Sequence, residues 1–371
     1  MHIMHVIDSL DIGGAERAAV DLANVSVKNG FRVSFCTTRH AGALALELSP
    51  AISTYHLNRT KRFDWQAMQR FAQLIDDIQV DIVHAHMRST AALMMLLKTL
   101  GWLKTPVLLQ DHHGIEIDSS IPLWLSWWGR RVIDQYVGVY PKLCQWAKRA
   151  GFRDDRIDYV GHAMDLSRLN SVQAIDVRRE FDLPIDRPVG IVVGNTRLEK
   201  GTDTFIQLIA ESPTAKQAVY IIVGRDADPE FAQMCRGLLA NHGLQDTIRF
   251  VGLRHDVPSL LRGVDFAVMP SRSESGPLVL IEYLAAGLPF VSFNVGDLAG
   301  QIAPKGVPGF APPGDVTAFQ QELEKLLKMA LDERVQRGKA GRKIAEDRFS
   351  IEAKLPEWQQ IYQKLLSRSA S

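Results

Sequence analysis

Short apolar runs alternate with longer amphipathic segments along most of this chain. His2 to Ile7 and Phe31 to Thr37 are predicted to be buried strands, and Ala15 to Asn29 is predicted to be the helix between them. The order strand, helix, strand is the one that builds a parallel sheet. A new strand begins at Val189 to Val193, so the same alternation continues in the second half. The pattern predicts an α/β protein.

The stretch from Asp265 to Ser292 carries the clearest pattern in the second half. Asp265 to Pro270 is an apolar run that ends at a proline, which is typical of a buried strand. Leu278 to Ala286 is apolar at helical spacing, and the Gly-Leu-Pro that follows predicts the end of a helix. Phe290 to Phe293 then restarts as a strand. The unit is therefore strand, loop, helix, strand.

Two glutamates lie on either side of the start of that helix. Glu274 is in the loop, and Glu282 follows it with seven residues between. Unpaired backbone N–H groups at a helix start suit a phosphate. A carboxylate one turn into the helix can accept hydrogen bonds from a ribose diol, and a loop carboxylate can accept them from sugar hydroxyls. Spacing alone leaves another interpretation open: Glu282 as a solvated helix residue and Glu274 as an acid favoured by the helix dipole.

The segment from Glu274 to Glu282, ESGPLVLIE followed by YLAAGLP, resembles the E-x7-E signature of retaining GT-B glycosyltransferases, and most of all the family 4 group that uses sugar nucleotides. The resemblance implies the GT-B fold, in which two Rossmann-like domains face each other across a cleft. It also implies a nucleotide-sugar donor and a metal-independent mechanism. It assigns the ribose to Glu282 and the sugar hydroxyls to Glu274. Glu274 is the only nearby acid and a candidate catalytic residue, and whether it or the diphosphate assists the incoming hydroxyl stays open. Donor contacts are implied for the backbone at Gly276, Pro277 and Leu278.

The bulk composition limits the class of protein. A chain of 371 residues is long for one core and suits two domains, and 46% hydrophobic with 23% charged residues is typical of a globular protein. A net charge of +1 gives no electrostatic reason to expect nucleic acid as a partner. Three scattered cysteines predict neither a disulfide framework nor a zinc site. No apolar run reaches the roughly 20 residues of a membrane span, and the first residues do not resemble a signal peptide. We expect a cytoplasmic location, with contact at the inner face of the membrane left open.

The first half carries a glycine pair and several histidines at predicted strand ends. Gly13 and Gly14 lie where the first strand meets its helix, so the backbone there can approach a ligand closely. The segment GGAER is not G-x-G-x-x-G, which weakens a dinucleotide interpretation. It resembles the glycine-rich loop of family 4 enzymes, which faces the donor phosphates and the acceptor. A plain tight turn is the alternative.

His84 and His86 are predicted to share one face of a strand. No third ligand at a suitable spacing follows them, so the sequence does not predict a zinc site. The resemblance places His86 weakly on the acceptor side and leaves His84 structural. In the next strand end, QDHHG resembles the family's histidine-glycine pair, which selects His113 as the residue that contacts the transferred sugar. The neighbouring His112 leaves this register ambiguous by one position.

In the second half, RLEKG resembles the family's arginine and lysine pair that holds the donor diphosphate, which points to Arg197 and Lys200. Alone, two such cations at a helix start would more often face solvent. Val251, at the end of a predicted strand, is also expected on the donor side. Asp226 and Asp228 match the D-x-D of metal-dependent glycosyltransferases, but Asp-Pro-Glu reads as a helix cap with proline at the first helical position. We therefore expect no metal ligand and no cofactor.

Two amphipathic segments complete the chain. Leu123 to Ile133 contains three tryptophans followed by two arginines, which suits burial, the lining of an acceptor groove or, less well, a membrane surface. Pro356 to Leu366 has an apolar stripe, and in GT-B proteins such a last helix crosses back to the first domain. We expect an acceptor-side domain at 1–165 with the crossover helix 350–371, and a donor-binding domain at 166–349.

The motifs occur in the family's order over nearly the whole chain. They predict a retaining, metal-independent enzyme of the hexosyltransferase type that moves a sugar from a UDP, GDP or ADP sugar to a glycan, lipid-linked or small-molecule acceptor. A sugar-nucleotide epimerase and a non-catalytic nucleotide-binding protein of the same fold are the alternatives. A nicotinamide dehydrogenase fits least, because the glycine fingerprint is missing.

Overall fold

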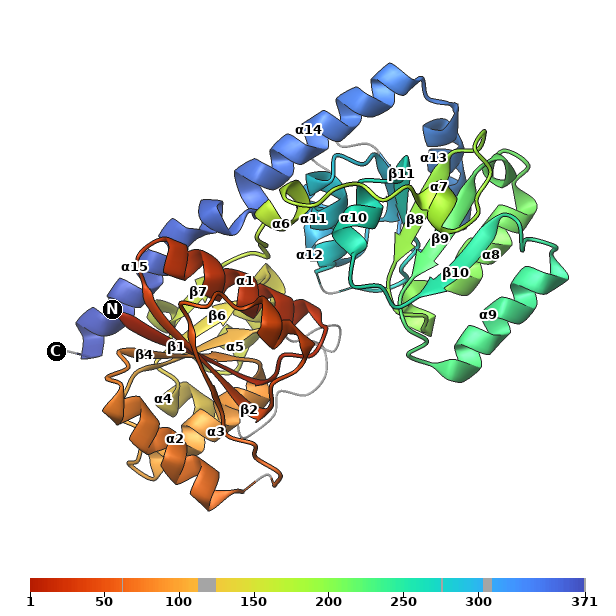
Figure 1. Ribbon diagram of the computed structural model, residues 1–371. Coiled ribbons are helices and arrows are strands. Elements are labelled where there is room, and N and C mark those ends of the chain that lie inside the picture. The colour runs from red at the N-terminus through yellow and green to blue at the C-terminus, as the bar shows by residue number, and fades with distance from the viewer. Residues whose placement is uncertain (62, 113–124, 275, 303–308, 370–371) are drawn as a thin grey trace. The chain divides into compact units, whose positions relative to one another are not determined.

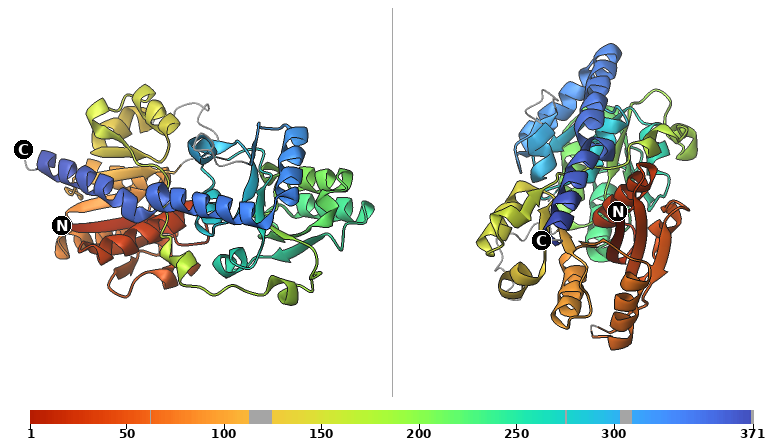
Figure 2. Two further views of the ribbon diagram at one scale, coloured as in Figure 1. Left: turned by 90° about the horizontal axis from the view of Figure 1, so that it is seen from above. Right: turned by 90° about the vertical axis from the view of Figure 1, so that its left-hand side faces the viewer.

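The computed structural model describes residues 1–61, 63–112, 125–274, 276–302 and 309–369 (Figure 1). The chain divides into two compact units. Unit 1 is Met1–Asp165 with Phe349–Ser371, and unit 2 is Leu166–Arg348. Each unit is built around its own parallel sheet with helices on both faces (Figure 2). The α/β class predicted from the sequence is confirmed.

Unit 1 has a seven-stranded sheet in the order β3-β2-β1-β4-β5-β6-β7, and every strand pair is parallel. Its strands are β1 (His2–Ser9), β2 (Arg32–His40), β3 (Ser53–His56), β4 (Ile82–His86), β5 (Val107–Asp111), β6 (Gln135–Gly138) and β7 (Ile157–Tyr159). Its helices are α1 (Gly14–Lys28), α2 (Trp65–Asp77), α3 (Arg88–Thr99), α4 (Arg130–Val132), α5 (Pro141–Arg149) and α15 (Ile351–Ser369), with short turns at η1 (Ala43–Glu47), η2 (Leu125–Gly129) and η3 (Asp154–Arg156).

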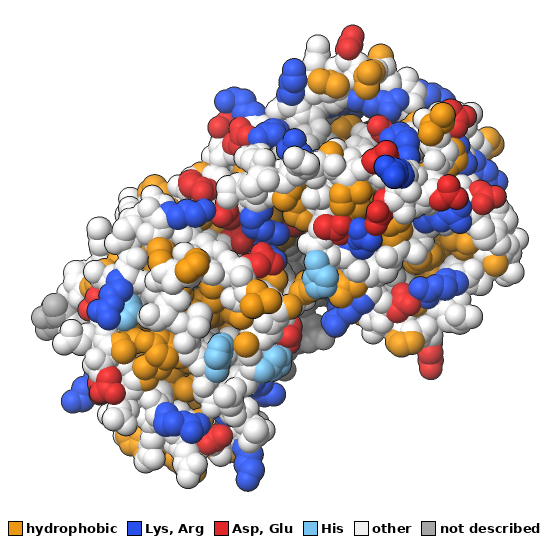
Figure 3. Space-filling view, in the orientation of Figure 1, with side chains coloured by type: hydrophobic (Ala, Val, Ile, Leu, Met, Phe, Trp, Pro, Cys, Tyr) orange, Lys and Arg blue, Asp and Glu red, His pale blue; other side chains and the backbone are white. Residues whose placement is uncertain are grey.

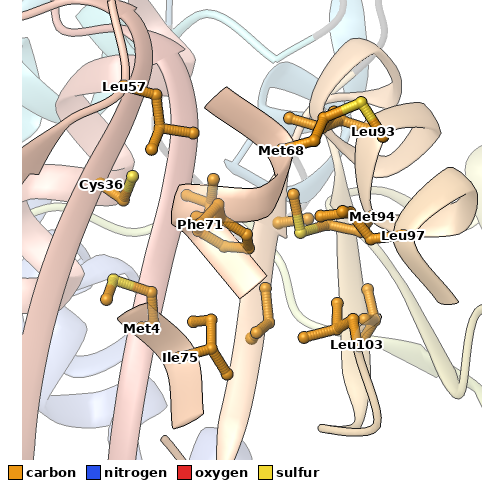
Figure 4. Close-up of a cluster of buried hydrophobic side chains, with 14 of the residues drawn as sticks. Met4, Cys36, Leu57, Met68, Phe71, Ile75, Leu93, Met94, Leu97 and Leu103 are labelled. Carbon is orange, nitrogen blue, oxygen red and sulfur yellow. The ribbon is translucent and has the colours of Figure 1, made fainter. Parts of the chain in front are cut away.

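Alternation along β1 and β4 sends side chains to two different layers. Met4 and Val83 point to the face covered by α2 and α3, where Phe71 lies at the centre of a buried cluster (Figure 4). Ile3 and Ile82 point to the opposite face, where they pack against α1 and the apolar stripe of α15. The last helix of the chain is therefore part of the core of unit 1. The stripe predicted at Trp358, Ile361, Tyr362 and Leu365 is buried, as expected.

Unit 2 has a six-stranded parallel sheet in the order β10-β9-β8-β11-β12-β13. Its strands are β8 (Val189–Val193), β9 (Val219–Val223), β10 (Ile248–Gly252), β11 (Phe266–Met269), β12 (Phe290–Phe293) and β13 (Phe310–Ala311). Its helices are α6 (Ser167–Asn170), α7 (Val177–Glu180), α8 (Thr202–Glu211), α9 (Pro229–Asn241), α10 (Val257–Leu261), α11 (Leu278–Ala285), α12 (Gly296–Ile302), α13 (Val316–Lys328) and α14 (Leu331–Phe349), with turns η4 (Leu198–Lys200) and η5 (Ala215–Gln217).

The core of unit 2 depends on aromatic residues that meet across neighbouring strands. Tyr220 of β9 packs edge-on between Phe205 of α8 and Phe266 of β11, with ring centroids 5.1 and 5.8 Å away. β8 lies between those two strands and carries Gly190 there, where a Cβ would lie 2.6 Å from the Phe266 ring. The glycine thus makes room for the aromatic pair. The order β11, loop, α11, β12 predicted from the sequence is confirmed.

Charged side chains of both signs are interspersed on the visible face of each unit (Figure 3). This agrees with a formal net charge of +1. In the part of the chain that the structure describes, no helix is both long enough and apolar enough to cross a membrane.

Candidate functional site

Three glycines mark the carboxyl ends of three neighbouring strands in unit 2. Gly194 follows β8 and donates to Val223 O at 2.9 Å, while Gly224 follows β9 and donates to Gly252 O at 2.9 Å. A Cβ on Gly224 would lie 2.2 Å from Gly194 O. Without side chains the backbone at this edge can be approached closely, which is where open α/β sheets bind ligands. Sequence reasoning did not single out this row, because the glycines are about 30 residues apart and align only in the sheet.

The loop after β8 delivers the two predicted cations. Arg197 is extended and starts the turn η4, and its half-exposed side chain lies 3.7 Å from Glu199. Lys200 ends the turn, and its stem runs beside Gly194. Gly201 then adopts φ +68°, and a Cβ there would lie 2.1 Å from Pro270 O. Only glycine fits this turn, which holds Lys200 against the loop that follows β11.

Lys200 and Glu274 form an ion pair. Lys200 Nζ lies 2.6 Å from Glu274 Oε1, and the side chains are 21% and 11% exposed. The two residues are 74 positions apart and come from the loops after β8 and β11, which are adjacent strands. The structure therefore brings together two residues that the sequence predicted separately. A charge-assisted hydrogen bond at such partial burial is worth roughly 1.5–3 kcal/mol.

Arg272 clamps these two loops together. Its backbone N–H donates to Glu199 O at 2.8 Å, and its guanidinium donates to Leu198 O at 2.6 Å and to Asp203 Oδ2 at 2.7 Å. Arg272 thereby holds the backbone that precedes Lys200 and the side chain of Asp203 that follows it. Sequence reasoning missed this residue, because an arginine inside SRSESG has no spacing signature of its own.

The helix α11 begins directly beside the ion pair. Pro277 is its N-cap and makes no side-chain cap, so the first N–H groups at Leu278 receive no side-chain acceptor there. Gly276 precedes it in the loop, while Ser275 lies outside the described residues. Glu282 lies in the second turn of α11 and is half-buried. The amide end of this helix suits an anion.

Gly296, the first residue of α12, supports the same loop from another side. It has φ +78°, and a Cβ there would lie 3.0 Å from Pro277 Cδ and 3.2 Å from Glu274 Cβ. Any larger residue would push the loop that carries Glu274. This contact was also absent from the sequence-based prediction.

The two aspartates of the D-x-D sequence have structural partners. Asp228 Oδ1 accepts from Phe231 N at 3.1 Å and so caps α9, with Pro229 at the first helical position, as predicted. Asp226 Oδ2 accepts from Arg236 at 2.8 Å. Val251, the remaining donor-side prediction, is half-buried at an irregularity in β10, where the pairing with β9 skips one residue.

The glycine pair of unit 1 lies between β1 and α1. Gly13 is the extended N-cap of α1, and the exposed Gly14 is its first residue. The carboxylate of Glu16 folds back over Gly13, where a Cβ would lie 2.2 Å from Glu16 Oε2. Burial raises the pKa of Glu16 above its ordinary value. Glu16 is thus a further polar group at this strand end that the sequence-based prediction did not include.

The histidines of unit 1 form a buried cluster at the carboxyl end of β4. His86 Nε2 lies 2.9 Å from His5 Nδ1, and His86 Nδ1 lies 3.4 Å from His112 Nε2. His84 stacks face to face on His86, with ring centroids 4.3 Å apart. His113, the histidine predicted to contact the sugar, lies outside the described residues. The next residue after β4, Met87, has φ +73°, which is uncommon for a side chain of this size and marks strain beside the cluster.

The sequence showed no third ligand at a suitable spacing from His84 and His86, but the fold brings a third histidine beside them. His5 pairs with His84 across β1 and β4, and the ligand atoms of the three imidazoles lie within 4.8 Å of one another. The spacing argument failed because the third residue is nearly 80 positions away. Five of the six ring nitrogens nevertheless have hydrogen-bonding partners: His84 meets Tyr362 at 2.9 Å and Gln110 at 3.1 Å, and His86 is bonded at both nitrogens. The arrangement is therefore explained as a hydrogen-bonded network.

Burial keeps these imidazoles neutral near pH 7. Desolvation lowers the pKa of His5 to about 3 and that of His112 to about 4, and it lowers the pKa of His84 and His86 well below the ordinary value. His162 behaves in the same way, with a pKa lowered to about 3 by burial. A cavity of about 20 Å³, which is large enough for a water molecule, is lined by Gln110, His112 and His162 among other residues.

The tryptophan segment of unit 1 is only partly buried. Trp128 packs against the core of unit 1, and its Nε1 donates to Thr99 Oγ1 at 2.7 Å. Trp127 is 66% exposed, and the Arg131 guanidinium lies 4.8 Å above its ring. Trp124 lies outside the described residues. Burial, the first interpretation of this segment, thus holds for Trp128 and not for Trp127.

Comparison with known proteins gives matches in both units. The family model for glycosyl transferases group 1 matches residues 175–344, and the model for glycosyltransferase family 4 matches residues 12–168. The chain is 28% identical over 373 residues to N-acetyl-alpha-D-glucosaminyl L-malate synthase of Bacillus anthracis, covering 96% of this chain and 95% of that protein.

Solved structures resemble the whole chain at low sequence identity. A glycosyltransferase from Rickettsia africae has a TM-score of 0.81 at 18% identity, and 98% of each chain is covered. HepE of Anabaena, in complex with UDP and glucose, has a TM-score of 0.78 at 17% identity, with 99% of this chain and 100% of that chain covered. These likenesses establish the fold.

Proposed function

The chain belongs to the GT-B glycosyltransferases of family 4, and from that premise we propose that it transfers a sugar from a nucleotide sugar to an acceptor with retention and without a metal ion. It is a transferase of the EC 2.4 type with a nucleotide-sugar donor. The observation that carries the proposal is the ion pair of Lys200 and Glu274 beside the start of α11, where the N-cap Pro277 makes no side-chain cap.

In the proposed donor site, Lys200 exchanges one anion for another. Without ligand, Lys200 and Glu274 neutralise each other at 2.6 Å. A donor diphosphate would bind Lys200, Arg197 and the first amides of α11, and so release the Glu274 carboxylate. The released carboxylate can then accept hydrogen bonds from hydroxyls of the sugar. Cations and amides that stabilise the leaving diphosphate supply the main electrostatic work of the transfer.

Glu282 is proposed to bind the ribose of the donor. It lies on the same helix whose amide end would hold the diphosphate, one turn further along. Its half-buried side chain can accept hydrogen bonds from a diol, and its charge does not have to be buried in an apolar core. HepE was captured with UDP-glucose, which favours a UDP sugar as the first donor to test.

Unit 1 is proposed to bind the acceptor. Gly13 and His86 lie at the strand ends that would face the acceptor, and His113 is proposed to contact the transferred sugar. The Bacillus anthracis relative is named for a glycoside of L-malate, which favours a small hydroxylated acceptor as the first to test. Glycans and lipid-linked acceptors stay within the proposal, because loops vary freely on a fixed scaffold.

The experiment is an incubation with UDP, GDP and ADP sugars, each with and without a panel of acceptors. Transfer predicts nucleoside diphosphate that is released only when an acceptor is present, together with a glycosylated product of retained configuration. An epimerase would release a changed nucleotide sugar without acceptor. A binding protein would bind the nucleotide and show no turnover. Either of these results would replace the proposal.

The partners of the charged residues in unit 2 favour a mechanism without a metal ion. The carboxylates of Asp226 and Asp228 are occupied by Arg236 and by the cap of α9, while two cations stand at the proposed diphosphate site. We expect EDTA to leave turnover unchanged after removal of adventitious ions. Loss of turnover that added Mg²⁺ or Mn²⁺ restores would show that a metal takes part, and Asp226→Asn would then be the first variant to make.

A further inference from the structure

One line of hydrogen-bonded imidazoles crosses the sheet of unit 1. His5, His86 and His112 come from β1, β4 and the end of β5, and they are joined at 2.9 and 3.4 Å. The ring centroids are 5.2 and 5.7 Å apart, with planes inclined by only 21° and 29°. In both pairs the centroid separation exceeds the nitrogen separation by 2.3 Å (5.2 − 2.9 and 5.7 − 3.4). The rings therefore meet edge to edge, which is the geometry of N–H···N bonds in line.

Each bond in this line needs one donor and one acceptor. The imidazoles are neutral because burial lowers their pKa values, so each ring carries a single proton. The tautomers are thus linked, and only two arrangements of the line exist. In the first, the protons point from His5 towards His112. In the second, they point from His112 towards His5.

The free end of the line at His5 distinguishes the two arrangements. His5 Nε2 is fully buried and has no hydrogen-bonding partner among the described residues. The neighbouring Phe35 ring lies nearly parallel to His5, with centroids 5.9 Å apart and an angle of 15°, so its face cannot receive an N–H from that nitrogen. The second arrangement would leave a buried N–H unsatisfied at Nε2, whereas the first leaves only a lone pair there. Orphaned buried donors are the rarer and more costly case.

His84 stands beside the line without belonging to it. Its Nε2 faces the carbonyl oxygen of Gln110 at 3.1 Å and must therefore carry the proton. Its Nδ1 then accepts from the Tyr362 hydroxyl at 2.9 Å. Both of its nitrogens are satisfied within its own set of partners, so it does not compete with His86 for a proton.

We propose that His5 and His86 are positioning residues that fix His112 as the Nδ1–H tautomer. His112 then accepts at Nε2 from His86 and is left with one hydrogen-bond donor, Nδ1–H, at the carboxyl end of β5. It cannot act there as a general base through Nε2, because that lone pair is already engaged. A catalytic role for the Nδ1–H group of His112 rests on the proposed function, whereas the tautomer of His112 does not depend on it.

The test is long-range ¹H–¹⁵N correlation spectroscopy of the ligand-free protein at pH 7.5, with ¹⁵N-labelled histidine and His112 assigned from the spectrum of His112→Gln. We expect the pattern of an Nδ1–H tautomer at His112, favoured by about tenfold or more over the other form. A His112 ring of the wild-type protein that carries its proton on Nε2, or that averages between both forms, would refute the proposal; His112→Gln serves only to assign the signal.

Two variants then identify the positioning residues. His5→Phe removes the donor that sets the direction of the line, and it should let His112 populate both tautomers. His84→Phe removes a histidine of the same cluster that stands outside the line, and it should leave His112 unchanged. If both variants alter His112 equally, the cluster acts by packing and the line has no direction. Because these spectra need no substrate, failure here is separate from failure of the transferase proposal.

Discussion

Lys200 pairs with Glu274 in the ligand-free protein and would bind the diphosphate in the proposed complex. Lys200→Met keeps much of the stem that runs beside Gly194 but removes the charge. Losing one charge-assisted contact that strengthens as the diphosphate leaves should lower kcat/KM by about 10²- to 10³-fold. Steady-state kinetics with the best donor and acceptor measure this.

Lys200→Arg and Lys216→Met are the matched controls for this change. The first keeps the charge and should retain more activity than Lys200→Met, and the second removes an exposed lysine of unit 2 that has no place in the proposed site. Equal activity of Lys200→Met and wild type would mean that the diphosphate binds elsewhere.

Glu282 should matter for binding far more than for folding. Its side chain is half-buried and does not belong to the buried apolar residues of α11, so Glu282→Ala removes no apolar side chain from the core. Losing a hydrogen bond from a ribose hydroxyl to a charged group should weaken nucleotide affinity by about tenfold or more. Isothermal titration with UDP, GDP and ADP measures the affinity, and urea unfolding measures stability. A large loss of stability with unchanged affinity would contradict the ribose role.

The site residues that were predicted from the sequence lie within short motifs, whereas those that were missed depend on contacts between distant segments. Glu274, Lys200 and Glu282 lie in short local motifs, so one window of sequence contains the signal. His5 joins His84 only through the pairing of β1 with β4, and Arg272 acts through a loop that follows a neighbouring strand. Such contacts are created by the register of the sheet, which the sequence of either segment alone does not state.

At the scale of elements, α14 packs against the end of α11 through bare backbone. A Cβ on Gly338 would lie 1.9 Å from Gly287 O, a backbone atom that cannot rotate away. Gly338→Ala must therefore shift one helix, and it should destabilise unit 2 by about 1–3 kcal/mol. The gain in helix propensity, up to about 1 kcal/mol, offsets only part of this cost. Urea unfolding followed by circular dichroism measures the difference.

Gly237→Ala is the matched control for α14. Gly237 lies inside α9, and a Cβ there meets nothing within 4 Å. The same substitution should thus stabilise the protein by about 0.5–1 kcal/mol, because only the propensity and the entropy of the unfolded chain change. If both variants changed stability in the same direction, the close contact of α14 with α11 would not be significant in solution.

Elements with strong apolar runs were predictable, and those set by tertiary contacts were not. β1, β8, β11, α11 and β12 follow apolar periodicity closely. The short β3 has mostly exposed or half-buried residues and so lacks that pattern. The amphipathic segment Leu123 to Ile133 is irregular in its described part, with a π turn at η2 before the short α4. Trp128 of this segment packs against the core of unit 1.

Over the whole molecule, the buried histidines are distributed unevenly. Among the described residues, the histidines whose pKa burial lowers strongly all belong to unit 1; they are His5, His84, His86, His112 and His162. For His5 the native pKa of about 3 lies below the ordinary value of 6.5, so between these two pH values the unfolded chain binds the proton and the native chain does not. Stability contributed by this neutral group is complete above pH 6.5 and declines as the pH falls through that window.

Unit 1 should therefore lose stability before unit 2 on acidification. Keeping His5 neutral costs roughly 2 kcal/mol at pH 5 relative to pH 7, because pH 5 lies about 1.5 pH units below the ordinary pKa. Hydrogen exchange followed by mass spectrometry should show protection lost first in β1 and β4 and retained longer in β8 and β9. His5→Phe should flatten the pH dependence of the unfolding free energy by about the same 2 kcal/mol, even if the variant is less stable at pH 7. A slope identical to that of wild type would mean that His5 is protonated in the native state or that its environment admits water.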